Sequence, residues 1–214
     1  VQADAAALVA GTPLAGAPVF AVSALEGLRD AGVAALQRHL LGEARAQAPA
    51  RDADAGFRLA VDRVFTLAGT GTVVTGTVHA GRVRAGDELR LVPGERLLRV
   101  RSVHAQNRPV EAARAGERGA LALAGIAKEE IDRGQWLVVP AVAPATGAGG
   151  ASRIDTRLAL WHEESKPLRT GATVQVHIGA AVAQASVAVL DADVLAPGAS
   201  ALVQLVLHRP LGAW

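Results

Sequence analysis

The 214-residue sequence contains no cysteine and no methionine. Without cysteine, the chain has no disulfide framework, no thiolate zinc site and no thiol nucleophile. Because every translated chain begins with methionine, a chain that starts at Val1 and contains none is expected to be processed or a fragment of a longer protein. No apolar run approaches the ~18 residues that span a bilayer, and no basic-then-apolar leader is visible. We therefore expect a soluble, cytoplasmic chain with no membrane partner.

Charge is nearly balanced over the whole chain but uneven along it. The net charge is +2, whereas residues 57–118 hold 11 arginines against 6 acidic residues. Arginine presents a planar fork that suits phosphate, which favours a polyanion partner for this block. Arginine used only as a solubilising residue in an alanine-rich and arginine-rich chain explains the composition equally well. The six histidines are scattered without metal-ligand spacing, so no metal site is expected.

The glycine-rich stretch Leu67–Leu91 is the first candidate for a nucleotide site. A phosphate-binding loop needs the order GxxxxGK[ST], and Gly71 and Gly76 have the required gap. Thr77 stands where the lysine is needed, however, and the first lysine of the chain is Lys128. The dinucleotide fingerprint GxGxxG also fails, because a strand-like run follows instead of a helix. We therefore expect no phosphate site in this stretch.

Alternating β-branched residues from Thr72 to Val78 instead favour a half-buried strand, so the stretch is predicted to be a hairpin in a barrel. Its glycines are expected at turns and at close backbone approaches, and they occupy positions 69, 71, 76, 81 and 86. Similar short strands are predicted at 57–61, 89–91, 98–100, 121–123 and 136–139, and then at 154–161, 173–178, 183–190 and 201–207. Turn signals every ~8–12 residues argue for all-β barrels or sandwiches.

The first block of the chain has a different pattern. Ala17–Val22 is predicted to be a strand, and apolar residues at helical spacing from Leu28 to Leu41 predict a helix that stops at Gly42. Linkers are expected at 44–56 and at 140–152, where the sequence reads PAVAPATGAGGAS. The predicted domains are therefore 1–50, 55–140 and 151–214.

Three motifs in the middle block resemble one protein family. They are DRVFTLAGTGTVVTGTVHAG from Asp62, GDELRL from Gly86, and AGERGALALAGIAKEEIDRGQWL from Ala115. Together they resemble the second domain of translational GTPases of the elongation factor Tu kind. Asp62, Arg63 and Arg118, with the sequence of the third block, are most similar to the selenocysteine-specific elongation factors (SelB).

The resemblance implies a mainly β fold, with two consecutive translation-factor β-barrels preceded by a strand–helix remnant of an α/β GTPase domain. Ser23, Ala24 and Leu25 match the last guanine-contacting motif of that domain. The phosphate loop, the magnesium-binding aspartate motif and the NKxD motif are absent from the sequence. We therefore expect no catalytic residue and no cofactor in this fragment, with GTP and magnesium bound by a full-length parent. The barrel at 151–214 is expected to be truncated.

The resemblance also implies selenocysteinyl-tRNA and the ribosome as partners, with a messenger hairpin bound only through a missing C-terminal region. Arg63 and Arg118 are then the contacts for the selenolate, and Asp62 orients them. An ordinary Asp and Arg network closing a barrel end is the structural alternative for these residues. The functional alternatives are another elongation factor Tu-like carrier, or a β-barrel interaction module with no RNA role.

Overall fold

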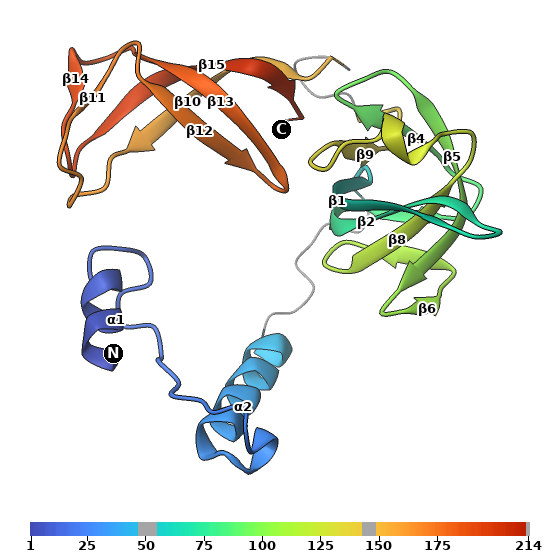
Figure 1. The fold of residues 1–214 in the computed structure, drawn as a ribbon, viewed down its shortest axis with the longest axis horizontal. Helices are drawn as coiled ribbons and strands as arrows, with labels where there is room; N and C mark the ends of the chain where they lie inside the picture. Colours follow the sequence, from blue (N-terminus) through green and yellow to red (C-terminus); the bar gives the residue numbers. More distant parts are fainter. Residues whose placement is uncertain (47–54, 143–148, 213–214) are drawn as a thin grey trace. The chain divides into compact units, whose positions relative to one another are not determined.

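The computed structural model describes residues 1–46, 55–142 and 149–212. The chain divides into two compact units, Val1–Ala50 and Arg51–Trp214, and each is described here by itself (Figure 1). Most of the two predicted linkers falls on residues 47–54 and 143–148, which lie outside the described residues.

The first unit holds two α-helices, α1 (Gln2–Val9) and α2 (Ala31–Ala46), and a short 3-10 helix, η1 (Gly27–Arg29). Helix α2 begins after Asp30, whose Oδ1 accepts the backbone N–H of Val33 at 2.9 Å. This carboxylate satisfies one of the backbone donors that every helix start leaves free. None of the residues 1–46 is buried.

Two predictions for this unit are wrong. Ala17–Val22 forms no strand, because a strand needs a neighbour for its backbone groups and the described residues of this unit contain no other strand. Helix α2 continues through Gly42 to Ala46, because one exposed glycine costs a helix only about 1 kcal/mol. Helix α1 is also missed, since its alanine-rich sequence has no clear apolar stripe.

The second unit begins with a closed barrel in residues 55–142. Six strands pair in the order β4-β9-β1-β2-β8-β5, and an additional pairing of β4 with β5 closes the ring (Figure 1). Their bounds are β1 (Arg58–Leu67), β2 (Gly71–Ala80), β4 (Glu88–Val92), β5 (Leu97–Ala105), β8 (Arg118–Leu123) and β9 (Trp136–Val138). The short strand β6 (Arg108–Pro109) extends the sheet beyond β5. Closure leaves the barrel strands with neighbours on both sides.

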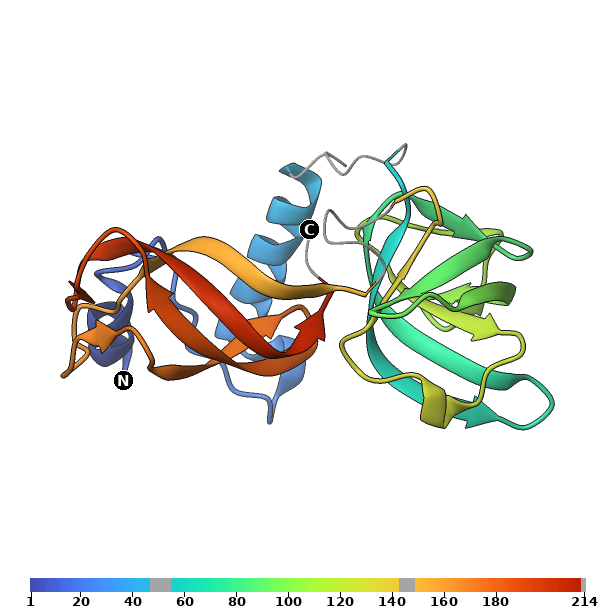
Figure 2. The same cartoon turned by 90° about the horizontal axis from the view of Figure 1, so that it is seen from above.

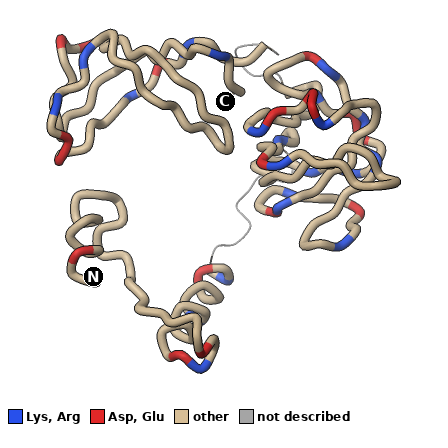
Figure 3. The backbone as a smooth tube through the Cα atoms, viewed as in Figure 1, with Lys and Arg blue, Asp and Glu red and all other residues tan. Residues whose placement is uncertain are grey.

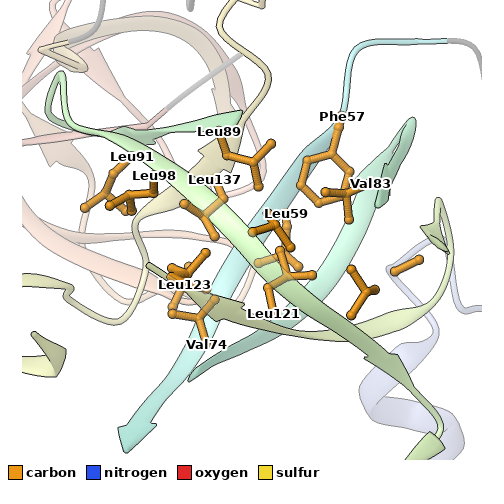
Figure 4. Close-up of a cluster of buried hydrophobic side chains, with 14 of the residues drawn as sticks. Phe57, Leu59, Val74, Val83, Leu89, Leu91, Leu98, Leu121, Leu123 and Leu137 are labelled. Carbon is orange, nitrogen blue, oxygen red and sulfur yellow. The ribbon is translucent and has the colours of Figure 1, made fainter. Parts of the chain in front are cut away.

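Leucine and valine side chains fill the barrel (Figure 4). Leu59 and Leu121 are both 0% exposed, and they come from strands far apart in the sequence. The other labelled core side chains are Phe57, Val74, Val83, Leu89, Leu91, Leu98, Leu123 and Leu137. Alternation along each strand sends these side chains inward and their neighbours outward, as the sequence pattern predicts.

The stretch Leu67–Leu91 is more than the single hairpin predicted for it. Its turn at residues 68–70 joins β1 to β2, so the hairpin partner of β2 lies upstream. After Gly81 the chain forms β3 (Arg82–Arg84), which pairs with β7 (Ala112–Arg114) and not with β2. The predicted glycines at 69, 71, 81 and 86 have positive φ, which confirms their place at turns.

The β3–β7 ribbon has closely related turns at the end of each strand. The sequence Arg84-Ala-Gly-Asp follows β3 and Arg114-Ala-Gly-Glu follows β7. The carboxylate of Asp87 accepts the backbone N–H of Arg84 at 2.8 Å, and that of Glu117 accepts the backbone N–H of Arg114 at 2.7 Å. The acidic residue of each turn is thus bonded to the backbone that precedes it.

Residues 149–212 form a second all-β region. A four-stranded antiparallel sheet has the order β10-β15-β13-β12, and a two-stranded ribbon joins β11 to β14 (Figures 1 and 2). The bounds are β10 (Ala151–Ala159), β11 (Leu168–Arg169), β12 (Thr173–Ile178), β13 (Ala181–Val189), β14 (Val194–Leu195) and β15 (Ser200–Leu211). All four strands predicted here are present, and the predicted mainly β fold class is confirmed.

Candidate functional site

Asp62 occupies a β-bulge in strand β1. Val61 pairs with Gly76 and Arg63 pairs with Thr75, so Asp62 is an extra residue on the β1 side. A Cβ added to Gly76 would overlap the carbonyl oxygen of Ala60, which shows how closely the two strands approach beside the bulge. A bulge redirects side chains locally, and here it directs the Asp62 carboxylate toward β2 and β8.

Two side chains, those of Arg118 and Thr75, surround the Asp62 carboxylate. Arg118, on β8, forms an ion pair with Asp62, in which Nη1 faces Oδ2 and Nη2 donates to Oδ1 at 2.9 Å. Thr75, on β2, donates its hydroxyl to Asp62 Oδ1 at 2.8 Å and accepts from Arg118 Nη2 at 3.0 Å. The Asp62 side chain is 24% exposed and that of Arg118 is 54% exposed. The pair therefore lies at the barrel surface, where a ligand can reach the guanidinium.

Arg118 lines a surface hollow of about 440 Å³, here called the Arg118 hollow. Its other lining residues include Thr75, His104, Asn107 and Glu117. A second hollow of about 330 Å³, the apolar hollow, has Phe65, Leu67, Val73 and Ala122 among its lining residues. His104, Asn107 and Ala120 line both hollows, so the two are contiguous. One site thus offers a cation on one side and an apolar surface on the other.

Arg63 lies apart from this pair. Its side chain is exposed and lines a separate hollow of about 540 Å³, together with Asp62, Lys128, Glu129 and Arg133. Among the described residues Arg63 has no ion-pair partner, whereas Arg118 is held by Asp62. The structure therefore brings Asp62 and Arg118 together, whereas Arg63 lines the separate hollow, here called the Arg63 hollow.

The turn between β5 and β6 contributes two residues to the Arg118 hollow that the sequence analysis missed. Gln106 and Asn107 both have positive φ, at 51° and 60°, between the paired residues Ala105 and Arg108. A two-residue turn with both central residues left-handed fits a tight hairpin. Asparagine tolerates this backbone but glutamine does so rarely, so strain is concentrated at the edge of the hollow. Asn107, a residue type that tolerates left-handed backbone, is the signal that could have located the turn.

The loop between β8 and β9, which borders the Arg63 hollow, is held by Arg96. The Arg96 guanidinium forms an ion pair with Glu130 and donates to the carbonyl of Gly125 at 2.6 Å. Glu130 also accepts the backbone N–H of Ala127 at 2.8 Å, at the start of the 3-10 helix η2 (Lys128–Glu130). This backbone hydrogen bond, and next the Arg96 side chain, lower the pKa of Glu130 below its ordinary value. Backbone and charge together fix the loop.

Ser23, Ala24 and Leu25 lie in the irregular segment before η1, and Leu25 is 96% exposed. Within residues 1–46, 55–142 and 149–212, no three His, Asp or Glu side chains gather to hold a metal ion. None of the helices in the described part of the chain is long and apolar enough to cross a membrane.

Known proteins resemble this chain in sequence. Residues 71–138 match the family described as elongation factor Tu domain 2. The selenocysteine-specific elongation factor of Desulfomicrobium baculatum is 36% identical over 211 residues, which is 99% of this chain and 32% of the relative. That of Escherichia coli (strain K12) is 48% identical over 125 residues, 57% of this chain and 19% of the relative. The chain thus spans about a third or less of the length of these relatives.

A solved structure has the same fold. The apo form of translation elongation factor SelB from Methanococcus maripaludis superimposes with a TM-score of 0.81 at 21% identity. The match covers 99% of this chain and 48% of that chain.

Proposed function

Because this chain belongs to the family of selenocysteine-specific elongation factors, translational GTPases related to elongation factor Tu, we propose that its barrel recognises the amino acid on selenocysteinyl-tRNA. The whole protein would deliver that tRNA to the ribosome in the cytoplasm, using GTP and magnesium bound elsewhere. In this scheme residues 1–50 belong to the GTPase domain, and 55–140 and 151–214 are domains 2 and 3. Ser23, Ala24 and Leu25 would contact guanine, and a messenger hairpin would bind outside this chain.

The recognition problem is to separate selenocysteine from serine, which differ by selenium in place of oxygen. A selenol ionises below neutral pH and a serine hydroxyl does not, so a positioned cation distinguishes them by charge. A charge-assisted hydrogen bond is roughly twice as strong as a neutral one. When a neutral ligand displaces the water around an arginine without replacing its hydrogen bonds, binding carries a free-energy penalty of ~1–3 kcal/mol. Discrimination between the two amino acids would come from both the stronger hydrogen bond to the selenolate and the penalty with serine.

The single observation that carries this proposal is the Asp62–Arg118–Thr75 network at the edge of the Arg118 hollow. Asp62 and Thr75 engage the two terminal nitrogens of Arg118, which fixes the direction of the guanidinium. Arginine has five N–H donors, so donors remain for a ligand. A guanidinium already fixed by Asp62 loses little further conformational entropy when a selenolate binds.

The apolar hollow supports the same assignment. An aminoacyl-tRNA ends in a nucleoside esterified to the amino acid, so its binding site needs a cationic part and a flat apolar part side by side. The Arg118 hollow and the apolar hollow have this arrangement, with His104 and Asn107 shared between them. A nucleobase stacked on aromatic or apolar groups gains ~1–3 kcal/mol without sequence readout. Phe65 and Val73 offer such a surface.

Arg63 is proposed as a second cation for the selenolate, reached from the Arg63 hollow, which Asp62 also lines. It has no ion-pair partner among the described residues, so its charge is available to a ligand. Because Asp62 lines this hollow and also binds Arg118, the three residues would act together.

Replacement of Arg118 with alanine tests the proposal. Affinity for selenocysteinyl-tRNA should fall by ~1–3 kcal/mol, the range for one charge-assisted partner, while affinity for seryl-tRNA stays nearly constant. Asp62→Ala should also reduce the ratio of the two affinities, because Arg118 is then free to move. Equilibrium filter binding measures both tRNAs under the same conditions. An equal loss for both tRNAs would make Arg118 a backbone clamp and contradict the proposal.

A further inference from the structure

The Arg118 hollow has an acidic side as well as a cationic one. Glu117 directly precedes Arg118, lines the same hollow and has a half-buried side chain. Among the described residues that line the hollow, Glu117 alone is acidic. Figure 3 shows that acidic and basic residues are interspersed over the barrel, so each charge acts on its own surroundings. A ligand in this hollow therefore meets both a cation and an anion.

Hydrogen bonds hold Glu117 in place at its backbone and its side chain. The backbone N–H of Glu117 donates to the carbonyl of Arg114 at 3.0 Å, and its carbonyl accepts the backbone N–H of Val78 at 2.9 Å. The carboxylate oxygen Oε2 accepts the backbone N–H of Arg114 at 2.7 Å. Within the described part of the chain, Glu117 has no ion-pair partner. Its carboxylate is thus positioned in advance, and Oε1 keeps the capacity to accept from a ligand.

The matching turn at Asp87 shows that the turn itself does not require a glutamate. The carboxylate of Asp87 accepts the backbone N–H of Arg84 at 2.8 Å, and its carbonyl accepts the backbone N–H of Val100 at 2.9 Å. These are the same two bonds that Glu117 accepts in its own turn. Asp87 is exposed, however, and does not line the Arg118 hollow. The longer acid therefore occurs at the turn that borders the hollow.

We propose that Glu117 binds the α-ammonium group of the aminoacyl ester while Arg118 binds the selenolate, an inference that rests on the proposed function. An α-amino group is largely protonated at neutral pH. In selenocysteine this cation and the selenolate are on neighbouring carbon atoms, and the hollow presents opposite charges from the neighbouring residues Glu117 and Arg118. The ammonium donates N–H groups to the carboxylate in charge-assisted hydrogen bonds.

The two contacts have different consequences for specificity. Every aminoacyl-tRNA carries the α-amino group, so Glu117 adds affinity for selenocysteinyl-tRNA and seryl-tRNA alike. Arg118 separates these two tRNAs from each other. Glu117 instead separates a tRNA with a free amino acid from a deacylated or N-acetylated tRNA, which lacks the cation.

The variant Glu117→Gln tests the inference, because the amide oxygen of glutamine can still accept the backbone N–H of Arg114 and keep the turn. Affinity for both aminoacyl-tRNAs should fall by about tenfold, the scale of one charge-assisted hydrogen bond, with their ratio unchanged. Loss of an acidic residue close to a polyanion ordinarily strengthens binding, so the expected change has the opposite sign to a general effect of charge.

N-acetylation supplies the second measurement. Equilibrium filter binding compares seryl-tRNA with N-acetylseryl-tRNA, and N-acetylation should weaken binding by about tenfold in the unchanged chain and little in Glu117→Gln. Asp87→Asn is the matched control, since it alters the equivalent turn outside the hollow, and it should behave as the unchanged chain does.

Three outcomes would overturn the inference. Glu117→Gln could bind both aminoacyl-tRNAs as tightly as the unchanged chain or more tightly, which would indicate that Glu117 only repels phosphate. N-acetylation could weaken both chains equally, or Asp87→Asn could cause the same loss as Glu117→Gln, which would indicate a structural role. Because seryl-tRNA carries no selenolate, its comparison with N-acetylseryl-tRNA decides the role of Glu117 even where Arg118 fails to distinguish selenocysteine from serine.

Discussion

The helices of residues 1–46 and the barrel of residues 55–142 make opposite use of similar apolar residues. In the barrel, Leu59 and Leu121 are 0% exposed, whereas Leu25 in the first unit is 96% exposed. No residue of 1–46 is buried at all. Apolar composition therefore does not build a core by itself. The barrel has one because the pairing of β4 with β5 closes its sheet around the side chains.

Among the glycines of the barrel, Gly76 is the one whose substitution should reduce stability most. In Gly76→Ala the new Cβ would overlap the carbonyl oxygen of Ala60, which belongs to the paired strand and has little room to move. We expect a loss of about 4 kcal/mol or more in the free energy of unfolding, measured by denaturant titration. A loss below about 1 kcal/mol would show that the bulge beside Asp62 adapts easily.

Truncation of a leucine should destabilise the barrel more than the first unit, although by less than the glycine substitution does. Leu121→Ala opens a cavity in the closed core and should cost about 2–5 kcal/mol. Leu40→Ala in α2, where the side chain is 58% exposed, should change stability by less than about 0.5 kcal/mol. Denaturant titration of each variant measures the change in the free energy of unfolding. Equal changes in the two variants would contradict the contrast in packing.

In the first unit, one glycine substitution should be favourable. Nothing lies within 4 Å of a Cβ added at Gly42, which is inside α2. Gly42→Ala should therefore stabilise the helix by about 0.5–1 kcal/mol. Amide hydrogen exchange of α2 is the measurement, with increased protection expected and decreased protection contradicting this account.

The smallest expected effect is on the stability of the barrel at low pH, through the loop held by Arg96. The pKa of Glu130 is lowered from an ordinary value of 4.5, mainly by the backbone N–H of Ala127 and then by Arg96. A lowered folded-state pKa gives stability that is present above the unfolded value and is lost as pH falls through the folded value. Barrel stability below about pH 5 should therefore fall less steeply in Glu130→Gln than in the unchanged chain. Identical pH profiles would contradict the assigned role.

Local periodicity predicted much of this fold, and long-range pairing accounts for most of what it missed. The strand predicted at 173–178 has those bounds as β12, because alternation of side chains is a local signal. The pairing of β3 with β7 and the closure of β4 onto β5 join segments with no shared local pattern. They depend on which arrangement buries the most apolar surface, and no short window of sequence reveals this.

The candidate site divides in the same way. The motifs identify Asp62, Arg63 and Arg118 as candidate site residues. They do not reveal that Asp62 binds Arg118 while Arg63 lines another hollow. That division follows from the bulge at Asp62, which depends on the register of β1 against β2. The repeated Arg-Ala-Gly-acid turns are visible in the sequence, yet only the register shows Arg82 opposite Arg114.

The most direct test of the account is the pH dependence of tRNA selectivity. The ratio of affinities for selenocysteinyl-tRNA and seryl-tRNA is measured as pH falls from neutral through the pKa of the selenol. Because both tRNAs share every other titrating group, recognition of charge predicts that the ratio declines toward one as the selenolate is protonated. Arg118→Ala should start at a lower ratio and change less with pH, with the remaining change supplied by Arg63. A ratio that stays constant across this range in the unchanged chain would contradict recognition by charge.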